Sequence, residues 1–116
     1  MQRSFRLTRS EDFKRVRRDG KSYAHPLVVL IVQNNDQPRV RVGVAAGKSV
    51  GTAVARNRAK RLLREVMRTL LLNIASGFDL VLIARPALAS ATLAEARRAL
   101  ENLLQRAKIF TPKNES

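Results

Sequence analysis

The stretch Arg56-Asn57-Arg58-Ala59-Lys60-Arg61-Leu62-Leu63-Arg64-Glu65-Val66-Met67-Arg68 has the spacing of an amphipathic helix. With 3.6 residues per turn, the apolar side chains fall on one side of this helix: Ala59, Leu62, Leu63, Val66, Met67 and Leu70. The other side carries Asn57, Lys60, Arg61, Arg64 and Arg68. The apolar side needs a surface on which to pack, while the basic side is free to bind a polyanion.

Strands on both sides of this helix in the sequence can supply the packing surface. Residues 27–32 are a short β-branched run, residues 39–44 alternate between apolar and other side chains, and residues 78–84 are almost wholly apolar. We expect the first two to form an antiparallel hairpin, with Arg39 and Arg41 on the more polar face of the second strand.

Two further helices are predicted from capping signals. Thr8 and Glu11 have the spacing of a capping box, and the helix that they open ends near Asp19-Gly20. Thr92 and Glu95 repeat that spacing before the last helix. The apolar stripe of the last helix is Leu93, Ala96, Leu100, Leu103, Leu104 and Ala107.

The order of these elements predicts the fold class. Thr52 can cap the basic helix, which runs to about Leu72. The chain then reads as helix, two or three strands, helix, strand, helix, which is typical of an α+β sandwich. We expect a single domain over residues 1–116, with residues 1–5 and 112–116 frayed.

Charge narrows the class of partner. The 23 Lys and Arg against 9 Asp and Glu give a formal charge of +14, which favours nucleic acid. An anionic membrane surface is the alternative, although the basic helix has no interfacial Trp. The absence of cysteine and of any long apolar run agrees with a cytoplasmic protein.

No catalytic motif is evident in the protein itself. The run from Gly43 to Ser49 is similar to a phosphate-binding P-loop but is one residue too short, and Gly43 fits the alternation of a strand. His25 precedes Pro26 without a nearby partner, so a turn residue is the simpler interpretation. The sequence therefore predicts neither catalytic nor metal-binding residues.

Two features can be explained by structure alone or by binding. A charged helix face is often only solvated, but this one has Glu65 alone against six basic residues and cannot neutralise itself. Arginine outnumbers lysine there, which suits forked contacts with phosphate. Phe13 on the first helix is a core residue or a platform for base stacking, and composition favours the core.

The run from Val42 to Glu65 resembles the signature of the bacterial ribonuclease P protein component, above all in Arg56-Asn57-Arg58 followed by Lys60-Arg61 and Arg64-Glu65. The resemblance extends to Glu11-Asp12-Phe13 and to residues 78–86. It implies a subunit of an RNA-dominated enzyme that removes the 5′ leader from precursor tRNA. The RNA subunit would carry the chemistry with Mg²⁺, and no membrane or small-molecule substrate would be involved.

The resemblance also implies a fold and a set of contacts. The fold is a two-layer sandwich of a roughly four-stranded mixed sheet and three helices, in the order α-β-β-β-α-β-α, with an unusual left-handed βαβ crossover. Residues implied to contact the RNA are Lys48, Arg56, Asn57, Arg58, Lys60, Arg61, Arg64 and Arg68. Residues implied to line a cleft for the single-stranded leader are Phe13, Lys14 and Arg17.

Departures from the family pattern and rival functions complete the expectations. Ser49 and Thr52 stand where relatives often have lysine and asparagine, and Val28 and Ile31 are aliphatic where relatives can have aromatics. Weaker stacking on the leader is therefore expected. The rivals are a non-catalytic basic RNA-binding protein of the ribosomal or chaperone type and an autonomous nuclease.

Overall fold

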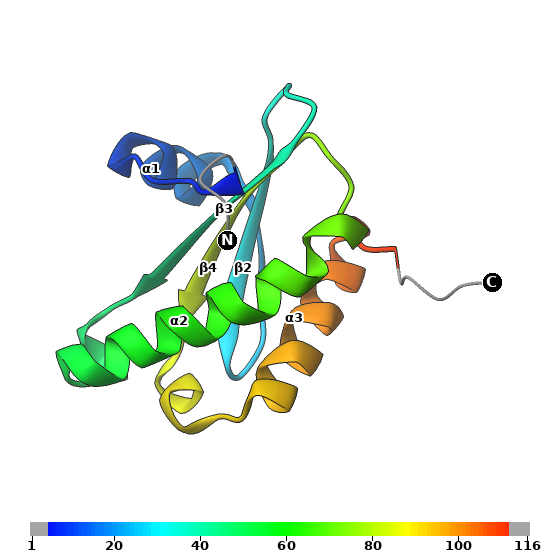
Figure 1. Cartoon of the computed structure of the whole chain (residues 1–116). Coiled ribbons are helices and arrows are strands. Elements are labelled where there is room, and N and C mark those ends of the chain that lie inside the picture. The colour runs from blue at the N-terminus through cyan, green and yellow to red at the C-terminus, as the bar shows by residue number, and fades with distance from the viewer. Residues whose placement is uncertain (1–4, 112–116) are drawn as a thin grey trace.

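A four-stranded mixed sheet forms the centre of the molecule (Figure 1). The computed structural model describes residues 5–111, so most of the two ends expected to fray lie outside the described residues. The elements are α1 Ser10–Asp19, β1 Lys21–Ala24, β2 Val28–Asn34, β3 Val40–Ala46, α2 Ala53–Leu70, β4 Phe78–Ala84 and α3 Leu93–Arg106. Short 3-10 turns are η2 Lys48–Val50, η3 Leu71–Asn73 and η4 Pro86–Ser90.

The strand order is β1-β2-β4-β3, so the predicted hairpin between β2 and β3 is wrong. The last strand, β4, inserts between them, antiparallel to β2 and parallel to β3. Nearly every β4 side chain is buried. Because side chains alternate between the two faces of a strand, both faces of β4 are covered, as is typical of a strand at the centre of a sheet. The five residues that link β2 to β3 span up to about 17 Å, enough to cross the roughly 10 Å width of two strand spacings.

The β3-α2-β4 crossover is left-handed, as the family resemblance implied. In Figure 1 both strands point downward, α2 rises in front of the sheet, and β4 lies to the right of β3. Such a path turns against the right-handed rule that holds for almost all βαβ units. Local sequence carries no signal for this handedness.

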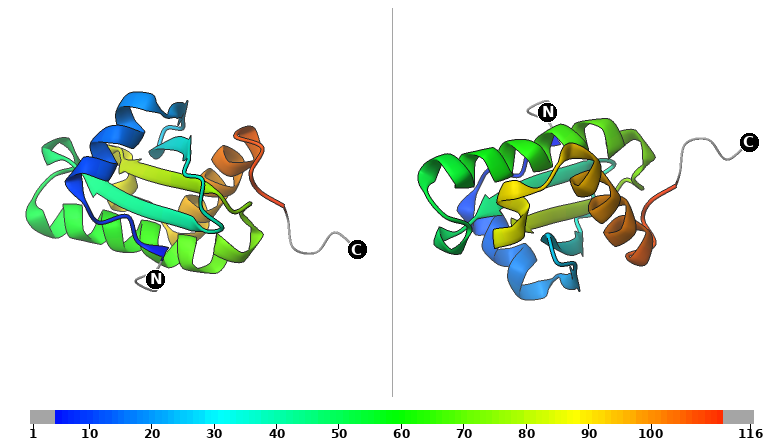
Figure 2. Two further views of the ribbon diagram at one scale, coloured as in Figure 1. Left: turned by 90° about the horizontal axis from the view of Figure 1, so that it is seen from above. Right: turned by 90° about the horizontal axis from the view of Figure 1, so that it is seen from below.

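Helices cover both faces of the sheet. Seen from above, α1 and α2 lie on opposite sides of it (Figure 2). The larger core lies between the sheet and the pair α2 and α3, and the smaller core places Val16 of α1 on Ile31 and Val81. The predicted apolar sides of α2 and α3 are confirmed, except that Leu93 is 48% exposed. Leu93 is the first residue of its helix and precedes the turns that pack.

The N-terminal caps predicted for α2 and α3 are confirmed, and the one predicted for α1 is wrong. Thr92 and Glu95 form the predicted capping box, and Thr52 caps α2. The box predicted at Thr8 is wrong, because α1 begins at Ser10 without a side-chain cap. The chain before it is held extended on β3, where the N–H of Leu7 donates to the carbonyl of Val42 at 2.9 Å.

The third strand expected before the basic helix is β1. It pairs with β2 from Lys21 to Ala24, and its Lys-Ser-Tyr-Ala sequence gives little strand signal by itself. Among residues 5–111, no helix has the length and apolarity required to cross a membrane.

Candidate nucleic-acid interface

The basic side of α2 is presented by a helix whose rotation is fixed by its cap and its core. The Oγ1 of Thr52 accepts the N–H of Ala55 at 3.2 Å, and Leu63 and Met67 are fully buried below. The polar side chains must therefore point outward or toward the flanks. Those exposed are Asn57, Arg58, Arg61 and Arg68, and those half-buried are Arg56, Lys60 and Arg64.

Most cations on α2 lack an acidic partner. Arg68 pairs with Glu65 at 2.5 Å, and this hydrogen bond raises the pKa of Arg68 and lowers that of Glu65. Within residues 5–111 no carboxylate forms an ion pair with Arg56, Arg58, Lys60, Arg61 or Arg64. Uncompensated positive charge on a rigid helix suits a phosphate backbone.

Arg58 differs from its neighbours because its exposed guanidinium is hydrogen-bonded to another part of the protein. Its Nη1 donates to the carbonyl of Ala89 at 2.8 Å and its Nη2 to that of Ala91 at 3.1 Å. The two bonds fasten η4 to the flank of α2. The resemblance implied an RNA contact at Arg58, whereas the structure gives it a role within the fold.

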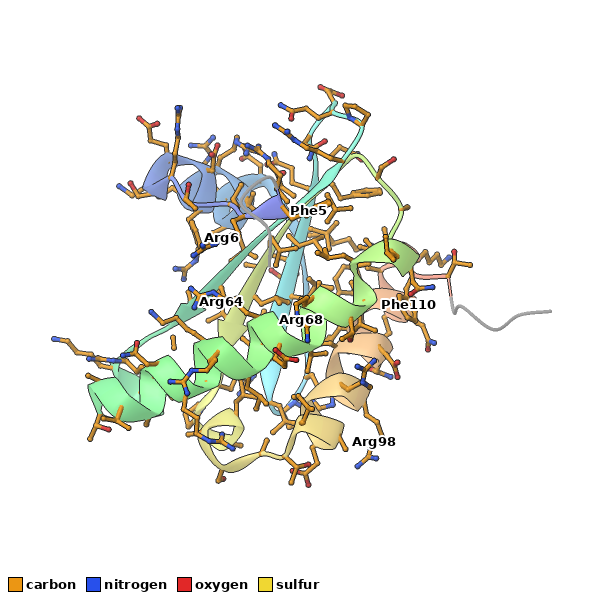
Figure 3. All side chains as sticks on the ribbon, viewed as in Figure 1. Phe5, Arg6, Arg64, Arg68, Arg98 and Phe110 are labelled. Atoms are coloured by element: carbon orange, nitrogen blue, oxygen red, sulfur yellow. The ribbon has the colours of Figure 1, made fainter. Side chains whose placement is uncertain are left out.

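Arg64 faces a second arginine from another part of the chain. Arg6 and Arg64 border a hollow of about 250 Å³ between α1 and α2 (Figure 3). We call this the Arg6–Arg64 hollow; its lining is Arg6, Leu7, Thr8, Phe13, Val42, Val44 and Arg64. The pKa of Arg64 is lowered mainly by its partial burial and to a smaller extent by repulsion from Arg6. Two facing arginines without a described acidic partner favour an anion between them.

Phe13 lines the Arg6–Arg64 hollow and also packs on the core. Its ring lies directly over Gly43, where an added Cβ would come within 2.4 Å of the ring Cζ. The side chain is half-buried beside Leu7 and Val16. The structure confirms that Phe13 packs on the core and shows that it also lines the hollow, while base stacking stays a prediction.

The other predicted cleft and loop residues lie elsewhere. Lys14 and Arg17 are exposed on α1 and are not among the residues that line the Arg6–Arg64 hollow. Lys48 is exposed in η2, between the carboxyl end of β3 and the start of α2. Gly43 lies in β3, which agrees with its interpretation as a strand residue.

An ionic cluster under α1 was not predicted. Asp79 of β4 has no exposed surface and is the buried polar residue among the described ones. Arg41 donates two hydrogen bonds to the Asp79 carboxylate, from Nε at 2.9 Å and from Nη2 at 2.8 Å. Arg15 of α1 donates a third at 2.7 Å, and Asn35 donates a fourth at 2.9 Å. Arg15 also bonds Asp12 and Gln33.

The cluster keeps Asp79 ionised. Burial alone would raise the pKa of Asp79, but hydrogen bonds from Arg41, Asn35 and Arg15 outweigh it and the pKa is lowered. The cluster joins α1 to β3 and β4, so it sets where Phe13 stands over the sheet. In the sequence, the available signal for this cluster is a single acidic residue in an otherwise apolar strand. In the structure that residue, Asp79, lies in register with Arg41 of β3.

Among residues 5–111, no three His, Asp or Glu side chains gather where they could hold a metal ion. The buried carboxylate of Asp79 has both oxygens hydrogen-bonded by Arg41.

Comparison with known proteins agrees with this geometry. The family model described as Ribonuclease P matches residues 1–108. The ribonuclease P protein component of Herpetosiphon aurantiacus is 43% identical over 110 residues, which cover 95% of this chain and 89% of the relative. That of Dehalococcoides mccartyi is 43% identical over 115 residues, covering 99% and 94%.

Solved structures lead to the same family. The ribonuclease P protein of Staphylococcus aureus superposes with a TM-score of 0.83 at 31% identity, covering 92% of this chain and 98% of the other. The Thermotoga maritima protein gives a TM-score of 0.79 at 32% identity, covering 87% and 96%. With these matches along nearly its whole length, the chain belongs to the ribonuclease P protein family and is the protein component of that RNA–protein endonuclease of tRNA processing.

Proposed function

We propose that the chain assists a catalytic ribonuclease P RNA in removing the 5′ leader from precursor tRNA in the cytoplasm. In this proposal the RNA carries the chemistry, with Mg²⁺ held by RNA, and the protein binds and positions. The observation that carries it is the Arg6–Arg64 hollow, where two arginines and Phe13 border one opening beside the basic side of α2.

The exposed side of α2 is the proposed contact with the catalytic RNA. Arg61 and Arg68 project outward, Arg56 and Lys60 flank them, and Asn57 can both donate and accept hydrogen bonds. Arginine forks bind phosphate oxygens in pairs, so several such contacts stabilise a folded RNA by screening its own repulsion. Lys48 extends this surface at the start of the helix.

The Arg6–Arg64 hollow is the proposed path of the leader. A leader phosphate between Arg6 and Arg64 would relieve their repulsion, and the adjacent base would meet the face of Phe13. Lys14 and Arg17 stand on the exposed side of α1, where they can attract the strand without enclosing it. Phe13 is the one aromatic among the residues that line this hollow, so we expect modest selectivity for leader sequence.

Reconstitution tests the function. Purified protein is mixed with ribonuclease P RNA and precursor tRNA at low Mg²⁺, and cleavage is followed on gels. We expect the protein to stimulate cleavage by the RNA and to cleave nothing alone. Absence of stimulation would favour the general RNA-binding protein, and cleavage without the RNA would favour the nuclease.

A second comparison isolates the leader. Arg64→Ala should weaken binding of precursor tRNA to the holoenzyme more than binding of mature tRNA, because only the precursor has a leader to reach the hollow. The matched control is Arg68→Ala, which removes an exposed arginine of the same helix outside the hollow. Equal loss for both RNAs would contradict the proposed path.

A further inference from the structure

A larger hollow lies away from the surfaces already described, between the β1–β2 turn, η4 and the first turns of α3. Its volume is about 630 Å³, within the range of pockets that hold small organic groups. We call it the α3 hollow; its lining is His25, Leu27, Ala87, Ser90, Ala91, Glu95, Arg98, Ala99 and Asn102. None of these residues belongs to α1 or α2.

The walls of the α3 hollow combine small aliphatic surfaces with polar groups. Leu27, Ala91 and Ala99 provide apolar surface, and Asn102 can both donate and accept. The Nδ1 of His25 accepts the N–H of Leu27 at 3.1 Å, so a neutral His25 carries its proton on Nε2 and can donate there. Apolar walls with both donors and acceptors suit a flat heterocycle such as a nucleobase.

Arg98 supplies charge beside this hollow. It extends from α3 into solvent (Figure 3) and has no hydrogen-bond or ion-pair partner in the described part of the chain. The adjacent Arg97, in contrast, donates to Thr69 and lies 3.9 Å from Glu101. The acid of the lining, Glu95, is engaged with the N–H of Thr92 in the helix cap. An unpaired guanidinium next to a base-sized hollow suits a phosphate.

The α3 hollow is joined to the basic helix through η4. From below, η4 lies against α2 on one side and α3 on the other (Figure 2). Arg58 of α2 bonds the carbonyls of Ala89 and Ala91, and Ala91 also lines the hollow. Arg58 therefore links α2 directly to a wall of the α3 hollow, which Arg98 also lines.

We propose that the α3 hollow is a second RNA site that takes one unstacked nucleotide, with its base between the aliphatic walls and its phosphate at Arg98. This inference rests on the proposed function, since the nucleotide belongs to the RNA bound along α2. It extends the RNA-binding surface from the face of α2 onto a third element.

Crosslinking locates the RNA without depending on activity. The chain has no cysteine, so Ser90→Cys carries a single photoreactive group into the α3 hollow. Asn57→Cys on exposed α2 is the positive control, and Asn34→Cys, at the opposite end of the sheet, is the negative control. Each labelled protein is assembled with ribonuclease P RNA and irradiated, and the crosslinked nucleotides are mapped.

We expect crosslinks from positions 90 and 57 to different nucleotides, and only background from position 34. Crosslinks from position 57 with background at position 90 would overturn the α3 site and leave the proposed function standing. Background at both positions would overturn both proposals together.

Binding measurements test the two halves of the site separately. Arg98→Ala should reduce the slope of log K against log salt by about one, because one phosphate contact is lost. Arg18→Ala, which removes an arginine paired with Asp19 on α1, is the charge-matched control and should leave the slope unchanged. Ala87→Trp fills the α3 hollow without changing charge and should weaken binding. Unchanged affinity in both Arg98→Ala and Ala87→Trp would overturn the site.

Discussion

Gly43 illustrates how a single missing side chain shapes the candidate site. The Phe13 ring occupies the place where a Cβ would lie, so the close contact between α1 and β3 depends on glycine at this position. Gly47, a few residues later, has open space instead, with no atom within 4 Å of the point that a Cβ would occupy. The two glycines thus form a natural pair for substitution.

Gly43→Ala should destabilise the protein by about 1–3 kcal/mol, because Phe13 must move out of a filled position. Urea unfolding gives the free energy, and Gly47→Ala serves as the control, with little expected change. If Gly43→Ala is as stable as the unsubstituted protein, Phe13 can move away at no cost. The position of the Phe13 ring over β3 would then not define the hollow.

Arg58 and Arg61 test whether two arginines of one helix have different roles. Arg58→Ala should cost about 1 kcal/mol of folding stability through its lost bonds to two carbonyls, with little change in the salt slope of RNA binding. Arg61→Ala should do the reverse, leaving stability intact and lowering the slope by about one. Denaturation and filter binding at several salt concentrations measure both quantities. The same slope change in both variants would place Arg58 on the RNA.

At the scale of elements, the cluster around Asp79 determines how α1 sits on the sheet. One carboxylate receives donors from α1, from β3 and from the turn before β3, which lie far apart in the sequence. α1 has ten residues and few apolar side chains, and Val16 is its one fully buried residue. The cluster therefore adds a polar attachment to the small hydrophobic contact that Val16 and Phe13 make with the sheet.

Asp79→Asn should lower stability at pH 7 by about 3 kcal/mol, since two partly buried arginines lose their counter-charge. The pKa of Asp79 is lowered in the fold, so its contribution is present above the unfolded pKa of about 4 and is lost as pH falls through the folded pKa. The difference in unfolding free energy between the unsubstituted protein and Asp79→Asn, measured by urea unfolding, should therefore narrow below pH 4.

Asp19→Asn is the control for that experiment, because Asp19 forms an exposed pair with Arg18 and its loss should matter little. A gap of constant size from pH 7 to pH 3 would contradict the ionised cluster and leave only the shape of Asp79 to explain its burial.

At the scale of the whole molecule, self-repulsion is the main electrostatic feature. A charge of +14 on 116 residues opposes compaction, and anions bound to the folded surface relieve it. Sulfate should therefore raise the melting temperature above that in chloride at matched ionic strength. Equal melting temperatures in calorimetry would show that the charges are already spread widely enough to be screened by any salt.

Local patterns predicted the elements well but not their arrangement. The period of α2 identified its packed side, and Thr92 with Glu95 identified a cap, because both signals depend on neighbours in sequence. Thr8 failed as a cap because Leu7 is held on β3, a contact with Val42 that no local pattern contains. The facing of Arg6 and Arg64 was missed for the same reason.

Strand order was the largest error, and its cause is physical. Alternation in residues 39–44 shows that one face is buried but not which strand lies alongside. The almost wholly apolar β4 was the available clue, since a strand buried on both faces belongs at the centre of a sheet. The left-handed crossover came from family resemblance, because nothing local opposes the usual hand.

The central place of β4 has a consequence for synthesis on the ribosome. Until residue 84 has left the exit tunnel, β2 and β3 have no strand between them and Arg41 has no counter-charge. A nascent chain of this length can form the native hairpin of β1 and β2, but β3 has no native neighbour in the sheet until β4 emerges. The sheet must therefore assemble late, after translation has passed β4, and the emerging basic chain is exposed to ribosomal RNA until then.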